Sequence, residues 1–136
     1  MELSKQQKHY EKVAFFDFDY TLAKTTECVK LWSPRGSRVE NGERFKFVNP
    51  QEYNVLKIAV DERIDDSSFS EFDRVDYQNA KKIYPTFVFF EKYLLETSTM
   101  PIIISARPQI AESDIFQFLS LNVEKPNIKQ LSNVLY

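Results

Sequence analysis

The chain has 136 residues, of which 43% are hydrophobic and 28% charged, so its composition is that of one globular domain and not of a disordered or fibrous protein. Eighteen basic and twenty acidic residues give a net charge of −2, which excludes a general electrostatic attraction to nucleic acid or membranes. Glycine occurs only at Gly36 and Gly42, which excludes glycine-rich nucleotide-binding loops. The single cysteine, Cys28, excludes an internal disulfide and a cysteine-rich zinc site.

The polar start of the chain has no apolar segment of signal-peptide type, and no run is long enough to cross a membrane. We therefore expect a cytoplasmic protein without a membrane partner. The only histidine, His9, lies in this polar start and is expected to be solvated, which argues against histidine-based triads.

Short apolar runs predict the strands. Residues 13–16 are all apolar and end at an aspartate, which predicts a strand buried on both faces of a parallel sheet. Residues 102–104 predict a second such strand, opened by Pro101. Residues 134–136 predict a third, although that run is too short for its alternation to identify a strand.

Helix signals lie between these runs. Asn49, Pro50 and Glu52 are typical of a helix start, and the apolar residues that follow share one face: Tyr53, Leu56 and Val60. A second helix is predicted after Pro85, with a stripe of Phe87, Phe90 and Leu94. A third is predicted over 108–121, with a stripe of Ala111, Ile115, Phe118 and Leu119. Strands alternating with helices predict an α/β fold with right-handed crossovers.

A long segment separates the first strand from the second helix. Its first part, 24–46, has six basic and three acidic residues and both glycines, which favours a hairpin. Its later part, 61–76, has seven acidic and two basic residues, and we interpret it as a solvated surface in preference to a metal site. Trp32 is expected to pack within the hairpin; the alternative is stacking on a base.

The strongest chemical signal is the stretch from Phe16 to Leu22, which directly follows the first strand and contains Asp17, Asp19 and Thr21. Ligands of open α/β sheets bind at the carboxyl ends of strands. Two carboxylates at this spacing can face one metal ion or phosphate, and Mg²⁺ prefers such oxygen ligands. The alternative is a pair of polar residues that merely ends a strand.

The second signal is at the end of the second strand, where Ser105 and Arg107 follow 102–104. A hydroxyl can donate to a phosphate oxygen, and a guanidinium can pair with a phosphate or a carboxylate. The alternative for Ser105 is a helix cap before Pro108. Two strands that both end in groups suited to phosphate strengthen the functional interpretation of each.

These two motifs resemble the first two motifs of the haloacid dehalogenase (HAD) superfamily of phosphohydrolases, in particular its small phage- and virus-type members. The resemblance implies a Rossmann-like HAD fold with a parallel sheet: a single domain, 1–136, with a core of about 10–22 and 84–136 and a cap or flap insert of about 23–83. It implies Mg²⁺-dependent hydrolysis of phosphate monoesters. Asp17 would be the nucleophile, forming an aspartyl-phosphate, and Asp19 the general acid and base.

The resemblance also implies that Asp17 and Asp19, the latter through its backbone carbonyl, hold Mg²⁺. Thr21 would steady the loop beside the phosphate, and Ser105 would bind the transferring phosphoryl group. Phosphoryl transfer depends mainly on positioning and on charge neutralisation, and these residue types supply both. The substrate is expected to be a phosphorylated small molecule, or a nucleotide or nucleic-acid end.

The chain departs from the family pattern in two respects. Tyr20 stands where many members have glycine or aspartate. No convincing lysine or late acidic residue supplies the third and fourth motifs, because Lys125 and Lys129 come too early and no acid follows Glu124.

Three interpretations therefore stay open: a compact phosphatase completed by its insert or a second subunit, a degenerate non-catalytic HAD-like module that binds a protein partner or phosphorylated ligand, and a fragment of a longer enzyme. A homo- or hetero-oligomeric partner would cover an open sheet edge. Two alternatives from other functional classes also stay open: a metal-dependent sugar-nucleotide transferase and a phospho-accepting signalling domain.

Overall fold

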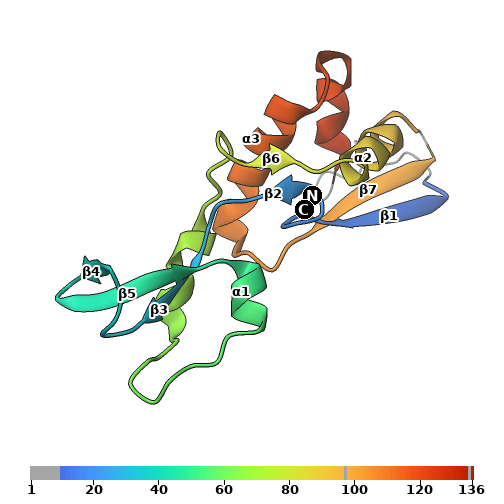
Figure 1. Cartoon of the computed structure of the whole chain (residues 1–136). Helices are drawn as coiled ribbons and strands as arrows, with labels where there is room; N and C mark the ends of the chain where they lie inside the picture. The colour runs from blue at the N-terminus through green and yellow to red at the C-terminus, as the bar shows by residue number, and fades with distance from the viewer. Residues whose placement is uncertain (1–9, 97, 135) are drawn as a thin grey trace.

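The computed structural model of the chain describes residues 10–96, 98–134 and 136, and its centre is a parallel pair of strands. Strand β1 (Lys12–Asp17) pairs in parallel with β7 (Thr99–Ile104), and the register places Asp17 opposite Ile104. Figure 1 shows the two strands side by side, with helices α2 (Thr86–Leu95) and α3 (Glu112–Asn122) near them. The fold is thus mixed α/β with a small two-stranded parallel sheet, and both predicted internal strands are confirmed.

The core is rich in phenylalanine and is built by the two predicted helical stripes. Every member of both stripes is buried, which confirms the helical periodicity of 86–95 and 112–122. The rings pack edge to face: Phe16 against Phe90 and Phe18 against Phe118, each with 5.5 Å between ring centroids. Such pairs add a specific attraction to the hydrophobic burial of the rings.

The prediction that both faces of the strands are buried is wrong. Phe16 and Ile103 belong to the buried core, whereas Val13, Phe15 and Ile104 are 52%, 61% and 52% exposed. Side chains alternate between the faces of a strand, so packing against one face leaves the other face open.

The predicted third strand is also not formed. Val134 and Tyr136 lie in irregular backbone, and Leu135 lies outside the described residues. The segment before them is a 3₁₀ helix, η4 (Lys125–Asn133). Leu131 of η4 and Val134 join the core, whereas Tyr136 is exposed, so Val134 is buried without pairing in a sheet.

The segment 23–83 leaves and re-enters the core through two short paired strands, β2 (Ala23–Lys24) and β6 (Lys81–Lys82). Between them lies a three-stranded antiparallel sheet in the order β3 (Val29–Trp32), β5 (Glu43–Val48), β4 (Arg38–Glu40). Figure 1 shows this sheet on the far side of the molecule from β1 and β7, with α1 (Pro50–Asn54) between the sheet and these two strands in this view. We call the whole segment 23–83 the insert.

The glycines of the insert make its hairpin possible. Asn41 and Gly42 have φ angles of 50° and 81° and join β4 to β5, as expected of an Asn-Gly hairpin turn. At Gly36, a Cβ atom would lie 2.3 Å from the backbone of Phe45, so only glycine fits against β5. Trp32 is buried, packs on Phe45 and donates from its indole nitrogen to Ser67, which confirms the packing interpretation over base stacking.

The helix predicted from Asn49 begins as expected but is shorter. Asn49 and Glu52 form the predicted capping box, yet α1 ends at Asn54, and Val60 is fully exposed.

The acidic residues of 61–76 are largely exposed, and several pair with basic residues, as in the bidentate contact of Arg35 with Asp61 at 2.8 Å. They continue into the 3₁₀ helix η2 (Asp66–Asp73). None of the helices in the described part of the chain is long and apolar enough to cross a membrane.

Candidate functional site

The predicted site residues gather where β1 and β7 end. The Phe18 amide donates to the Ile104 carbonyl at 3.1 Å, so the loops that carry Asp17 and Ser105 leave the sheet side by side. Asp17 is exposed, and its Oδ1 accepts a hydrogen bond from the Phe18 amide at 2.9 Å. Ser105 Oγ accepts from the Arg107 amide at 3.1 Å, which holds the second loop in a turn.

The loop after Asp17 is a tight turn organised by one carbonyl. The Phe18 carbonyl accepts from the amides of Thr21, Leu22 and Ala23 at 3.0 to 3.3 Å. Thr21 therefore contributes to the turn through its main chain. Tyr20 has a φ of 59°, a left-handed conformation that costs an ordinary residue about 1–2 kcal/mol. This conformation explains why glycine or aspartate suits the position better, and the Tyr20 hydroxyl offsets part of the cost by donating to the Thr25 carbonyl at 3.1 Å.

Arg107 lies at the centre of a buried ionic network. Its Nε donates to Asp19 Oδ2 at 3.0 Å, and its Nη2 donates to Asp19 Oδ1 at 2.7 Å and to Glu27 Oε1 at 2.8 Å. Its Nη1 donates to the Arg74 carbonyl at 2.6 Å, and the guanidinium lies 5.1 Å from the centre of the Phe72 ring. The guanidinium thus joins the β1 loop to the insert.

The charges of the network support one another. Burial alone would lower the pKa of Arg107, but the hydrogen bond and charge of Asp19, together with those of Glu27, outweigh burial and leave the pKa raised. The Asp19 carboxylate also accepts from the buried Thr25 hydroxyl at 2.8 Å. In this arrangement Asp19 receives hydrogen bonds from two residues and holds Arg107 in place.

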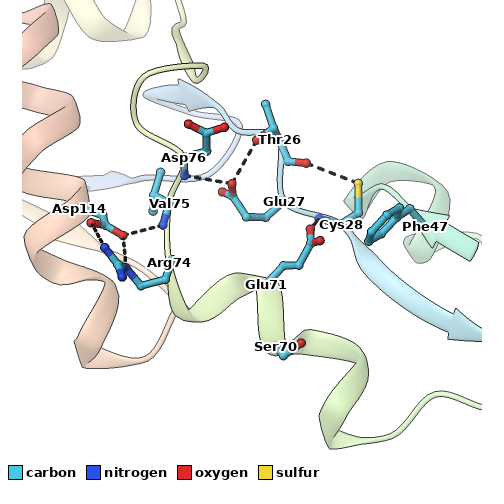
Figure 2. A pocket seen from close by; sticks show the side chains of 10 residues that line it. All are labelled: Thr26, Glu27, Cys28, Phe47, Ser70, Glu71, Arg74, Val75, Asp76 and Asp114. Atoms are coloured by element: carbon cyan, nitrogen blue, oxygen red, sulfur yellow. Dashed lines mark hydrogen bonds and ion pairs between the residues drawn. The ribbon is translucent and has the colours of Figure 1, made fainter. Parts of the chain in front are cut away.

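A second network ties the insert to the helical layer around a hollow of about 610 Å³ (Figure 2). Asp114, on α3, accepts from the Arg74 guanidinium at 2.7 Å and from the Val75 amide at 2.9 Å. The hydrogen bond from Arg74 is the main cause that lowers the pKa of Asp114. Glu27 also accepts from the Asp76 amide at 3.1 Å. The acidic lining of this hollow is therefore engaged in holding the molecule together.

Two further hollows meet at Arg107. One, of about 260 Å³, lies between Ser105 and the start of α3. The other, of about 630 Å³, lies between Asp19 and the insert, with Ala106 to Pro108 on the core side and α1 and η2 on the insert side. Ser105 lines the smaller hollow, Asp19 the larger, and Arg107 both. The Asp17 carboxylate lines neither and faces outward at the end of β1.

The sequence-predicted residues thus come together in two groups. Asp17, Thr21 and Ser105 lie in the adjoining loops at the sheet edge, and Asp19 and Arg107 form an ion pair beside them. Sequence reasoning missed the second partner of the guanidinium, Glu27. Glu27 carries no motif signal, because its role depends on how the insert folds back over the core.

The described residues offer few ligands for the Mg²⁺ that is expected from the sequence. In the described residues, no three or more histidine, cysteine, aspartate or glutamate side chains are grouped so that they could hold a metal ion. Asp17 offers an exposed carboxylate, whereas the Asp19 carboxylate is held by Arg107. The exposed Asp17 carboxylate could serve as a protein ligand of Mg²⁺, with water and phosphate oxygens completing the shell, an arrangement that Mg²⁺ accepts.

Comparisons with known proteins supply no family. Neither the protein-family models, nor the curated proteins, nor the solved structures include a significant match to this chain.

Proposed function

We propose that the chain is a HAD-like phosphatase that hydrolyses phosphate monoesters with Mg²⁺ through Asp17. The observation that carries the proposal is the parallel pairing of β1 with β7, with Asp17 in register with Ile104. This pairing supports a shared site at the carboxyl edge of the strands for an exposed carboxylate and the Ser105 hydroxyl. The order of strand, insert, helix and strand agrees with the expected HAD architecture.

In the proposed reaction, an oxygen of Asp17 attacks phosphorus, and the bond between phosphorus and the leaving oxygen breaks. Asp19 gives its proton to the leaving oxygen. Asp19 then takes a proton from water, which attacks the aspartyl-phosphate and releases phosphate and the free Asp17 carboxylate. Ser105 donates to a phosphoryl oxygen, and bound Mg²⁺ would supply neutralisation of phosphate charge.

The ion pair between Asp19 and Arg107 adds a step to this proposal. Both carboxylate oxygens of Asp19 accept hydrogen bonds from the Arg107 guanidinium, at 3.0 and 2.7 Å, so in this geometry neither oxygen is placed to donate to a leaving group. A bound phosphate would compete for the guanidinium, since Arg107 lines both hollows and phosphate is a strong bidentate acceptor. We propose that this exchange frees the Asp19 carboxylate, which then takes up a proton from solvent and gives that proton to the leaving oxygen.

The same ion pair favours a second candidate function, a non-catalytic HAD-like module that binds a phosphorylated ligand or a protein partner. Its structural argument is that Asp19 already has partners and that Mg²⁺ has few protein ligands. In that case Arg107 and Asp19 would serve only to stabilise the fold, and phosphate would bind without turnover.

Hydrolysis of p-nitrophenyl phosphate, with and without Mg²⁺, separates the two functions. We expect Mg²⁺-dependent turnover by the wild-type chain and loss of at least about a thousandfold in Asp17→Asn, because the amide cannot act as the nucleophile. Asp61→Asn is the matched control, since Asp61 is exposed and pairs with Arg35 in the insert. Turnover that survives in Asp17→Asn would refute Asp17 as the nucleophile, and a folded wild-type chain without turnover would favour the binding module.

A further inference from the structure

The larger hollow beside Asp19 has the position of a leaving-group pocket. Asp19 and Arg107 form its core side, and residues of α1 and η2 form its insert side. In the proposed reaction Asp19 protonates the leaving oxygen, so the group attached to that oxygen would extend from Asp19 into this space. The volume of about 630 Å³ is sufficient for a small organic group.

Aromatic rings line the insert side of this pocket. Tyr53 and Phe69 pack edge to face with 5.7 Å between their centroids, and both are partly exposed. Phe72 lies deeper and already carries the Arg107 guanidinium over its ring at 5.1 Å. The faces of aromatic rings attract cations, and a set of rings around one cavity is a common way to bind an organic ammonium group.

The charged residues that line the pocket also favour a cation over an anion. Asp66 and Asp73 line the pocket from η2, and within the described residues neither forms an ion pair. Asp19 and Arg107 pair with each other, so the two further carboxylates leave the pocket with a net negative charge. An anionic leaving group, such as a second phosphate or a carboxylate, would be repelled here.

The basic residues of the insert do not reverse this preference. Lys30 pairs with Glu40 at 2.9 Å, and Arg35 pairs with Asp61. Neither basic side chain lines the pocket. Two of the six basic residues of 24–46 thus have acidic partners within the insert, and none of the six lines the pocket.

We infer that this pocket binds an organic ammonium group, so that the preferred substrate is the phosphate monoester of an amino alcohol or quaternary ammonium alcohol. The inference rests on the proposed function for the hydrolysis of that ester, but the binding of the ammonium group does not depend on turnover. Tyr53 and Phe69 contact the ammonium group, and Asp66 and Asp73 balance its charge.

The test compares choline with 3,3-dimethyl-1-butanol, which has the same shape without the charge. Binding to the wild-type chain and to Asp17→Asn is followed by shifts of the protein amide resonances in NMR titrations. We expect choline to bind at least about tenfold more tightly than the neutral alcohol, and the shifts to cluster at α1 and η2. Equal binding of the two alcohols, or no binding of choline, would overturn the inference.

Two double variants show whether the pocket carboxylates are responsible. Asp66→Asn with Asp73→Asn should reduce choline affinity about tenfold and leave the neutral alcohol unchanged. Glu40→Gln with Asp61→Asn changes the net charge equally but outside the pocket, and should leave choline affinity unchanged. An equal loss in both double variants would mean that choline responds only to net charge, which would overturn the assignment.

Kinetics distinguish failure of this inference from failure of the proposed function. Turnover of p-nitrophenyl phosphate, with choline phosphate cleaved no faster than 3,3-dimethylbutyl phosphate, would refute the inference and leave the phosphatase standing. Selective choline binding without turnover of any ester would support the ammonium pocket and refute the phosphatase.

Discussion

Replacement of Arg107 by methionine tests the buried network that joins the core to the insert. Methionine fills much of the space of the arginine stem but removes all the hydrogen bonds that the guanidinium donates to Asp19, Glu27 and the Arg74 carbonyl. The side chains of Arg107 and Glu27 are only 2% and 8% exposed, so Glu27 would keep a buried charge without its partner.

The expected magnitude follows from this burial. Breaking a buried ion pair by removing one partner typically costs about 3–5 kcal/mol, because the remaining charge stays desolvated. We expect Arg107→Met to lose about that much in free energy of unfolding. Adding Glu27→Gln removes the stranded charge, so the double variant should be more stable than Arg107→Met alone.

Urea denaturation at pH 7 provides the measurement. The fluorescence of Trp32, which is the only tryptophan and is buried, reports on the insert, and far-UV circular dichroism reports on the whole chain. Arg38→Met is the matched control: Arg38 is exposed and, in the described residues, contacts the Phe47 ring without an ion pair, so its midpoint should barely move. A loss below about 1 kcal/mol in Arg107→Met, or a double variant less stable than the single one, would refute the reasoning.

Three further changes have defined outcomes. Asp114→Asn should lower the free energy of unfolding by about 1.5–3 kcal/mol at pH 7, because Asp114 is buried and accepts from the charged Arg74. The folded state lowers the pKa of Asp114 below its ordinary 3.8, so this stabilisation is present above about pH 4 and is lost at lower pH. The denaturation curves of variant and wild type should therefore converge in acid. Gly36→Ala should lose about 1–3 kcal/mol in thermal unfolding, because its Cβ would overlap the backbone of Phe45, and an unchanged midpoint would contradict the close packing. Phe118→Ala should lose about 3–5 kcal/mol by urea titration, since its ring is fully buried, and a loss below 1 kcal/mol would contradict its place in the core.

Local signals of the sequence predicted the parts of the fold that depend on neighbouring residues. The apolar stripes predicted the buried faces of α2 and α3, and the two glycines of 24–46 predicted a hairpin, which the structure forms at Asn41 and Gly42. The capping box at Asn49 was correct, but the length of α1 was not. A capping box determines where a helix begins, whereas its end depends on packing that the sequence does not display.

The candidate site was predictable only in part. Strand ends with Asp17 and Ser105 were visible as motifs, and the parallel pairing of the strands brings these loops together. The engagement of Asp19 by Arg107 was not predicted, because the two residues are 88 positions apart and either could have faced solvent or phosphate. The pocket proposed to bind an ammonium group was likewise invisible, since its lining comes from β3, α1 and η2 of the insert and from the loops after β1 and β7.

By itself, the sequence determined the α/β class, both strands of the parallel sheet, the helical faces and the identity of the chemical groups at the strand ends. These follow from side-chain periodicity and local backbone preferences. Only the tertiary structure decided which sheet face is covered, which carboxylates share the Arg107 guanidinium and where the insert leaves a cavity. These three features depend on contacts between residues far apart in the chain. Apolar patterning and charge allow many partners for each such residue, and only the folded structure selects one of them.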